Sequence, residues 1–216
     1  MKIICKTILY PPPPPFVGTR IKIAVTEENL NFGIFSIALA PGSEQFTIDW
    51  GDGKVQQFIG ITGLWHPYER PSNYEIRLSD DVGALQIGSS STSDEKFANE
   101  YPQMVLSFVT NAANLNELKS QAFYNCSNMS VFDMPVSPVT FLNSDTFKNC
   151  SALQGRIDIP RITGIAARPT MRFFTGCTGL TEIHFPASSE EAITSAGSYL
   201  ADPTLGSGNA RCVFDL

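Results

Sequence analysis

Apolar and polar residues alternate in twos between Ile21 and about Leu78. Four runs show the pattern: Ile21, Ile23 and Val25; Phe35, Ile37 and Leu39; Phe46, Ile48 and Trp50; and Tyr74, Ile76 and Leu78. Such alternation is typical of strands that turn one face to a core. Asp52-Gly53 adds a hairpin turn signal after the third run. The pattern predicts several short strands separated by turns, as in a small antiparallel sandwich.

The pattern changes in the second half, where one unit occurs three times. Each copy has an aromatic residue, a cysteine three residues on and an apolar residue three further on, and its later apolar run ends in proline: Phe123-Cys126-Met129 with Pro135, Phe147-Cys150-Leu153 with Pro160, and Phe174-Cys177-Leu180 with Pro186. The cysteines are 24 and 27 residues apart, which is the spacing of a solenoid repeat. We expect the copies to stack, with the three phenylalanines in one buried ladder and the three cysteines beside it.

These repeats resemble the BspA-type leucine-rich repeats of bacterial and protist surface proteins, whose unit reads approximately A-F-x-x-C-x-x-L-x-x-I-x-[IL]-P. The resemblance covers about residues 105–200, with a longer insert at Ile162–Arg172 and a frayed last copy around Ile193–Leu200. Val109, Ala112, Leu115 and Leu118 keep the spacing without the cysteine or the proline. They are expected to form an atypical first repeat.

The first half carries a second resemblance. Asp49-Trp50-Gly51-Asp52-Gly53, then His66-Pro67-Tyr68 and the segment 72–78, resemble the two signature segments of PKD-type immunoglobulin-like domains. The chain departs from that family in the Asp-Trp order and in Ser72-Asn73, where Pro-Gly is usual. The two resemblances together imply a mainly β fold, with a small immunoglobulin-like, PKD-like β-sandwich followed by a short BspA-type leucine-rich repeat solenoid.

The domain boundaries follow from these assignments. Residues 1–17 are expected to form an N-terminal arm with the polyproline segment Pro11–Pro15, and residues 18–80 the PKD-like sandwich. Residues 81–216 are expected to form the leucine-rich repeat domain. Within that domain, 81–117 are transitional or capping, 118–200 are regular repeats and 201–216 are a C-terminal cap.

Charge and hydropathy exclude several classes of partner. The net charge of −6 argues against general nucleic-acid binding, and no apolar run approaches the length of a membrane span. The first ten residues briefly look like a secretion signal, but Lys6 interrupts their apolar stretch and Pro11–Pro15 follow at once. We therefore expect no signal peptide here.

Residues able to do chemistry are few and scattered. No nucleophile-elbow, phosphate-loop or dinucleotide pattern occurs, and the five cysteines include no C-x-x-C. Asp49 and Asp52 could hold calcium, but acids at such turns more often accept hydrogen bonds from turn amides. His66 and Tyr68 are interpreted as packing residues, and His184 has no acidic or thiol partner at a suggestive offset. The glycosylation tripeptides at Asn125, Asn128 and Asn149 fall inside the repeat pattern and are attributed to coincidence.

A small basic cluster surrounds the long insert: Arg156, Arg161, Arg168 and Arg172. It is either a solvated rim or a binding surface for an acidic partner or a sulfated glycan. Because loops that interrupt a regular array often carry function, the insert is the preferred position for a binding surface.

The leading hypothesis is a non-enzymatic interaction protein without a cofactor or metal, which binds a protein or glycan ligand through a repeat surface. The repeat resemblance implies adhesion and an extracellular or cell-surface location. The alternative is a structural decoration of a phage tail or another extracellular assembly, on a phage particle, and a cytoplasmic location also stays open. An enzyme is disfavoured. The ligand, the oligomeric state and the roles of Cys5 and Cys212 stay open.

Overall fold

The computed structural model describes residues 16–59, 61–88, 102–136, 139–162, 164–165, 173–191 and 211–215. Over these residues the chain is mainly β, as the sequence predicts. Several predictions lie outside the described residues: those for Pro11–Pro15, Cys5, Arg168, Arg172, the last copy around Ile193–Leu200 and most of the expected cap 201–216.

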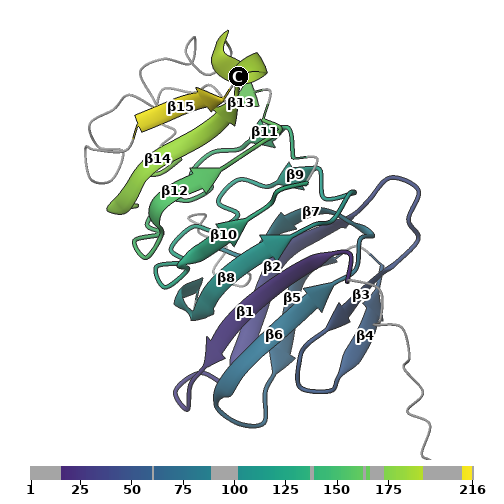
Figure 1. Cartoon of the computed structure of the whole chain (residues 1–216). Coiled ribbons are helices and arrows are strands. Elements are labelled where there is room, and N and C mark those ends of the chain that lie inside the picture. The colour runs from purple at the N-terminus through teal and green to yellow at the C-terminus, as the bar shows by residue number, and fades with distance from the viewer. Residues whose placement is uncertain are drawn as a thin grey trace, which may run out of the picture.

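The described residues form two six-stranded sheets and one three-stranded sheet (Figure 1). The first sheet has the order β10-β8-β1-β6-β3-β4. Its strands are β1 (Thr19–Val25), β3 (Phe46–Asp49), β4 (Val55–Phe58), β6 (Ser72–Leu78), β8 (Val105–Thr110) and β10 (Val131–Asp133). A short 3-10 turn, η1 (Pro102–Met104), leads into β8.

The second sheet has the order β13-β11-β9-β7-β2-β5. Its strands are β2 (Asn31–Leu39), β5 (Ile61–Pro67), β7 (Val82–Gln86), β9 (Glu117–Leu118), β11 (Phe141–Leu142) and β13 (Gly164–Ile165). The third sheet pairs β12 (Gln154–Asp158), β14 (Gly179–Pro186) and β15 (Arg211–Asp215), with the 3-10 turn η2 (Ala187–Ser189) after β14.

Strand direction changes from one half of the chain to the other. In the first half the pairs are antiparallel: β1 with β6, and β2 with β5. From β8 and β7 onward the pairs are parallel: β10 with β8, β9 with β7, β11 with β9, and β12 with β14. Parallel pairing follows when each copy of a unit repeats the path of the previous one.

The two halves are joined by strand pairing. β8 pairs antiparallel with β1, and β7 pairs antiparallel with β2. Both six-stranded sheets therefore contain strands from before and after residue 80. The division into domains stays a prediction, and each of its two expected parts contributes strands to the same two sheets.

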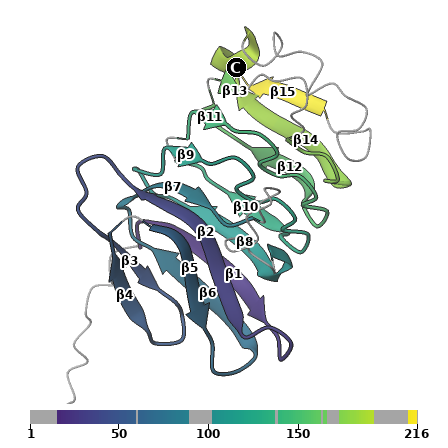
Figure 2. The same ribbon diagram turned by 180° about the vertical axis from the view of Figure 1, so that it is seen from behind.

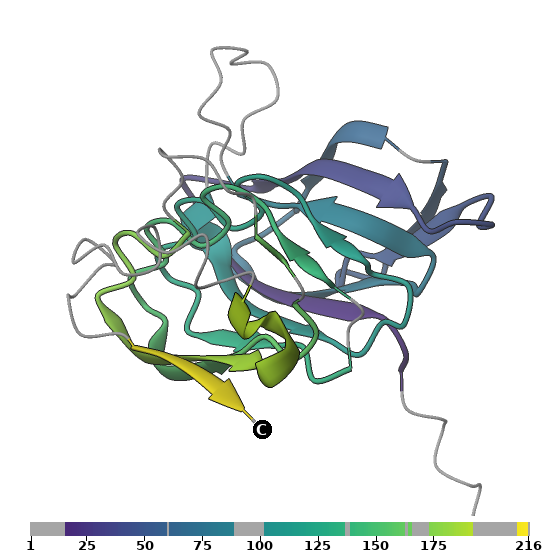
Figure 3. The ribbon, with the colours of Figure 1, turned by 90° about the horizontal axis from the view of Figure 1, so that it is seen from above.

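Figures 1 and 2 show the third sheet continuing the side of the molecule formed by β1, β8 and β10, with β12 beside β10. The hydrogen bond from the amide of Ala152 to the carbonyl of Ser127, 3.1 Å long, joins the turns of the two copies there. Figure 3 looks onto the stack from the end occupied by β14 and β15. One side of the molecule is thus a row of strands running from the first sheet into the third.

The inward positions of the strands form one continuous apolar core. In β1, Ile21, Ile23 and Val25 are buried and the residues between them are not, as the alternation predicts. Ile48 and Trp50 are fully buried in the same core.

The predicted aromatic ladder is confirmed. The ring centroids of Phe123 and Phe147 lie 5.5 Å apart and those of Phe147 and Phe174 lie 5.2 Å apart, and both pairs are stacked. Cys126, Cys150 and Cys177 are buried beside it. The Cys150 thiol donates to the carbonyl oxygen of Phe123 at 3.1 Å, and the Cys177 thiol to that of Phe147 at 2.9 Å. Each of these two cysteines thus contacts the phenylalanine of the preceding copy.

The turns after the phenylalanines also stack. The amide of Asn125 donates to the carbonyl of Lys148 at 2.9 Å, and that of Asn149 to the carbonyl of Thr175 at 2.6 Å. The side-chain amide of Asn149 donates to the Asn125 side-chain oxygen at 2.8 Å. Neighbouring copies are therefore linked by hydrogen bonds as well as by packing.

Candidate binding surface

The outward side chains of β6, β1, β8 and β10 form two rows across the first sheet. Strand register aligns one row as Glu75, Lys22, Ser107 and Val131, and the next as Arg77, Arg20, Val109 and Asp133. Successive side chains of a strand point to opposite faces, so the alternation that fills the core also builds this outer face. Residues far apart in the chain are thereby brought side by side.

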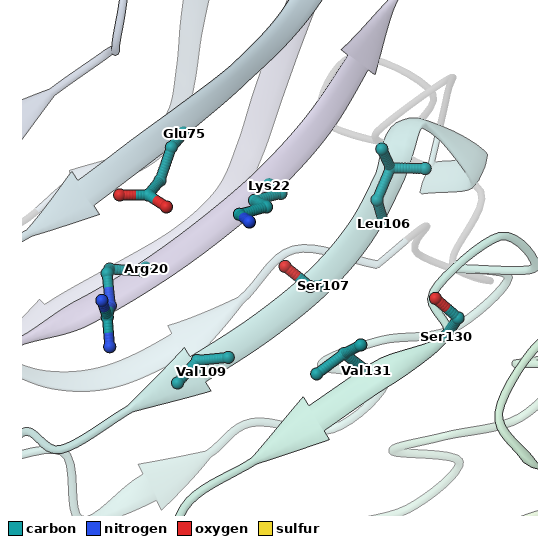
Figure 4. A pocket seen from close by; sticks show the side chains of 8 residues that line it. All are labelled: Arg20, Lys22, Glu75, Leu106, Ser107, Val109, Ser130 and Val131. Atoms are coloured by element: carbon teal, nitrogen blue, oxygen red, sulfur yellow. The ribbon is translucent and has the colours of Figure 1, made fainter.

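A groove of about 340 Å³ lies on this face (Figure 4). Arg20 and Lys22 of β1 line one side, and Ser130 and Val131 line the other. Between them lie side chains of β8, namely Leu106, Ser107 and Val109. Because the outward residues of β8 are smaller than the cations beside them, the surface is hollowed along that strand.

The cations in this groove are free of ion-pair partners among the described residues. Arg20 and Lys22 are both exposed. Glu75 also lines the groove, but its carboxylate accepts a hydrogen bond from Arg77 Nε at 3.0 Å. The groove therefore has a local excess of positive charge on a chain whose net charge is −6.

Sequence reasoning did not single out Arg20 or Lys22. Their groove partners Ser107 and Val131 come from strands in the other half of the chain, and the register between β1, β8 and β10 was needed to connect them. The sequence did indicate that both side chains point outward, because Arg20 and Lys22 occupy the polar positions of the alternating run 19–25.

Two of the four predicted surface arginines are described. Arg156 lies on β12, where its guanidinium pairs with the Asp158 carboxylate two residues on. Arg161 is exposed in the turn after Pro160. Arg168 and Arg172 lie outside the described residues, so the cluster stays a prediction.

A charged row crosses the third sheet. Glu182 on β14 accepts hydrogen bonds from Arg211 on β15 and pairs with His184 at 3.0 Å. The hydrogen bonds from His184 and Arg211 lower the pKa of the Glu182 carboxyl below its ordinary value. The expectation that His184 lacks an acidic partner was wrong, because residues two apart on one strand share a face.

Asp49 and Asp52 bind amides of their own turn. Asp49 accepts from the Gly51 amide at 2.9 Å, and Asp52 from the Lys54 amide at 3.0 Å. The second oxygen of Asp52 lies 2.9 Å from His66 Nε2. These contacts support the turn interpretation over calcium binding. No group of three or more possible metal ligands occurs in the part of the chain that the structure describes.

His66 and Tyr68 pack as expected. The His66 ring stacks on Trp50 with centroids 4.5 Å apart, and the Tyr68 hydroxyl donates to the Trp50 carbonyl at 3.0 Å. Partial burial acts to raise the pKa of Asp52. The hydrogen bonds that its carboxylate accepts from His66 and from the Lys54 amide, together with the charges of His66 and Lys54, outweigh this effect. The pKa of Asp52 is therefore lowered.

The repeat cysteines are suited to packing rather than to nucleophilic chemistry. Burial raises the pKa of the Cys126 and Cys150 thiols well above the ordinary value, so both stay protonated at neutral pH. Cys212 lies on β15 opposite Ile183 and is half-buried, and burial raises its pKa too.

The side chains of the glycosylation tripeptides are already engaged. The side chains of Asn125 and Asn149 are hydrogen-bonded to each other, and the side-chain amide of Asn128 donates to the Gln103 carbonyl at 2.9 Å. These contacts agree with the interpretation that the tripeptides arise from the repeat pattern.

Comparison with known proteins identified one family. The family model of the BspA type leucine rich repeat region matches residues 90–200 in six copies, which is just over half of the chain. Neither the curated proteins nor the solved structures gave a match. Over the described residues, no helix has the length and apolar character needed to cross a membrane.

Proposed function

Since the chain belongs to the BspA-type leucine-rich repeat family, we propose that it is a surface interaction or adhesion protein that binds a protein or glycan through its repeat surface. Repeats of this family are generally of the surface or adhesion type and typically non-enzymatic. The observation that carries the proposal is the continuous outer face of β6, β1, β8 and β10, extended by β12 and β14.

The composition of this face supports binding by many weak contacts. Charges of both signs lie close together on it, including Asp133 on β10 and Arg156 and Asp158 on β12. Such a mixed surface offers specificity through charge complementarity rather than through one deep pocket. An extracellular or cell-surface location belongs to the same proposal.

We also infer that residues 18–80 form a PKD-like, immunoglobulin-like sandwich that precedes a short solenoid. The support is the contact between the residues that carry the resemblance: Trp50 stacks on His66 and accepts a hydrogen bond from Tyr68. In this interpretation the sandwich presents the repeats and supplies β1 to their outer face.

A binding array of host proteins and glycans tests the function with the intact chain. A face variant, Asp133→Lys with Asp158→Lys, reverses two charges on β10 and β12. Its matched control, Glu27→Lys with Glu28→Lys, makes the same change in the exposed turn between β1 and β2. The expected result is a ligand whose affinity changes at least about tenfold in the face variant and stays the same in the control; an acidic ligand should gain affinity and a basic one should lose it.

Two outcomes would overturn the proposal. An equal change in affinity in both variants would mean that only net charge matters. Absence of any ligand on the array, together with self-assembly of the chain into larger particles, would instead support the alternative of a structural part of a phage tail or similar assembly.

A further inference from the structure

The groove on β8 has features that select one kind of ligand. Its floor lies in the middle of a sheet, since β8 pairs with β1 on one side and with β10 on the other. The backbone groups of Ser107, Phe108 and Val109 therefore face strands on both sides. An extended peptide cannot add to this sheet here, because strand addition needs a free edge. The groove must recognise its ligand through side chains.

Those side chains combine charge with hydroxyl and aliphatic groups. Arg20 and Lys22 project from β1 without ion-pair partners among the described residues. Ser107 and Ser130 offer hydroxyls, and Val131 offers an aliphatic surface that is 47% exposed. An unpaired Arg and Lys side by side favour an anionic group, to which they can make charge-assisted hydrogen bonds.

The remaining groups fit a sugar. Sugar hydroxyls can exchange hydrogen bonds with Ser107 and Ser130, and the C–H face of a ring can pack on Val131. The volume of about 340 Å³ is at the lower end of ligand pockets, which span about 300–1,000 Å³. A short segment of an oligosaccharide matches this size, and the other sugar units would lie along the open face of the sheet.

We propose that the groove between β1 and β10 binds an acidic oligosaccharide, with Arg20 and Lys22 holding its carboxylate or sulfate group. This inference rests on the proposed binding function and assigns it a place and a ligand class. The place differs from the arginine cluster around residues 156–172, so substitutions can separate the two.

Calorimetry with the intact chain tests the ligand class. The probes are trigalacturonate for a carboxylate, a sulfated chondroitin oligosaccharide for a sulfate, and neutral galactotriose and tetraglutamate as controls. Binding of at least one acidic saccharide, weakened by added salt, is expected, with much weaker binding of both controls. Binding of neither acidic saccharide overturns the proposal. Equal binding of galactotriose excludes the anionic contact, and equal binding of tetraglutamate excludes selection for a sugar.

Variants test the place. Arg20→Gln and Lys22→Gln should each lower the affinity for the acidic saccharide about tenfold or more. This is the scale of one lost charge-assisted hydrogen bond. Arg70→Gln, at an exposed loop position, should leave affinity unchanged and serves as the matched control. Thermal melts should be the same for all three, because each arginine or lysine is exposed.

A double variant at Arg156 and Arg161 distinguishes the groove from the predicted arginine cluster. If Arg156→Gln with Arg161→Gln abolishes binding while Arg20→Gln and Lys22→Gln do not, the groove assignment is wrong and the proposed function survives. If the groove variants alone lose the saccharide, the assignment is supported.

Discussion

At the scale of single residues, the position before each repeat cysteine has a demanding backbone. Asn125, Asn149 and Gly176 have φ angles of 63°, 64° and 80°. Asparagine adopts this left-handed region more readily than most residues, and glycine does so without strain. The third copy also needs glycine for space, since a Cβ on Gly176 would meet the side-chain oxygen of Asn149.

Gly176→Ala should therefore destabilise the protein more than replacement of a glycine that has a positive φ but no neighbouring atom in the way of a Cβ. Gly42 is the matched control, because it has a φ of 86° and open space around it. We expect a loss of about 1 kcal/mol for Gly42→Ala and about 2–3 kcal/mol for Gly176→Ala in urea unfolding. Equal losses would show that Asn149 can move aside without cost.

Asp52 gives the fold a dependence on pH. Its folded pKa is lowered from the ordinary value of 3.8, so its carboxylate stabilises the folded state above that value. The contribution is lost as the pH falls through the folded pKa. Asp52→Asn, which keeps the shape and removes the charge, should cost about 1–2 kcal/mol at neutral pH and much less in acid below the lowered pKa.

Thermal melts of the wild type and of Asp52→Asn, at neutral pH and in acid, measure this pH-dependent cost. Glu27→Gln, in an exposed turn, is the control and should shift neither melt. A cost of Asp52→Asn that stays constant with pH would contradict the assignment of the effect to the charge.

At the scale of elements, the repeat unit was predictable because its residues recur. Phe123, Phe147 and Phe174 hold equivalent places, and equivalent places stack in a repeat array. β2 was less predictable. Alternation placed Phe35, Ile37 and Leu39 on the inner face. Ile37 is buried as predicted, but Ile34 and Ser36, at the alternate positions of the strand, are buried too. Gly63 on the neighbouring strand has a φ of 79°, an irregularity that a pattern of apolar residues does not reveal.

The aromatic ladder predicts that alanine substitutions at two phenylalanines, Phe147 and Phe141, differ widely in their cost to stability. Phe147 is fully buried, whereas Phe141 on β11 is 41% exposed. Phe147→Ala should cost about 3–5 kcal/mol, because it opens a cavity between two stacked rings. Phe141→Ala should cost less than about 1 kcal/mol. Chemical denaturation checks both, and similar costs would contradict a ladder that contributes to stability.

At the scale of the whole molecule, the sequence indicated two kinds of unit but not how they join. The resemblances ended near residue 80 and began again near residue 105, so the segment between them had no assigned partner. Register supplies it, since β7 and β8 pair with β2 and β1. The groove depends on the same pairing, so the local sequence around Arg20 and Lys22 does not reveal it.

The shared sheets predict that both halves unfold together. Both tryptophans, Trp50 and Trp65, lie in the first half, so their fluorescence reports on it alone. Circular dichroism reports on the strands of both halves. In urea, the two signals should change at the same concentration, and Phe147→Ala should shift both. A fluorescence transition left in place by Phe147→Ala would show that the halves unfold independently.

The double seam of β1 with β8 and β2 with β7 has a mechanical consequence. A flexible linker between modules acts as a swivel, and tension then reorients each module separately. Here five residue pairs are aligned in one seam and four in the other, so the joint resists bending in more than one direction. A load along these strands would therefore act as shear across paired strands instead of turning one half about a linker.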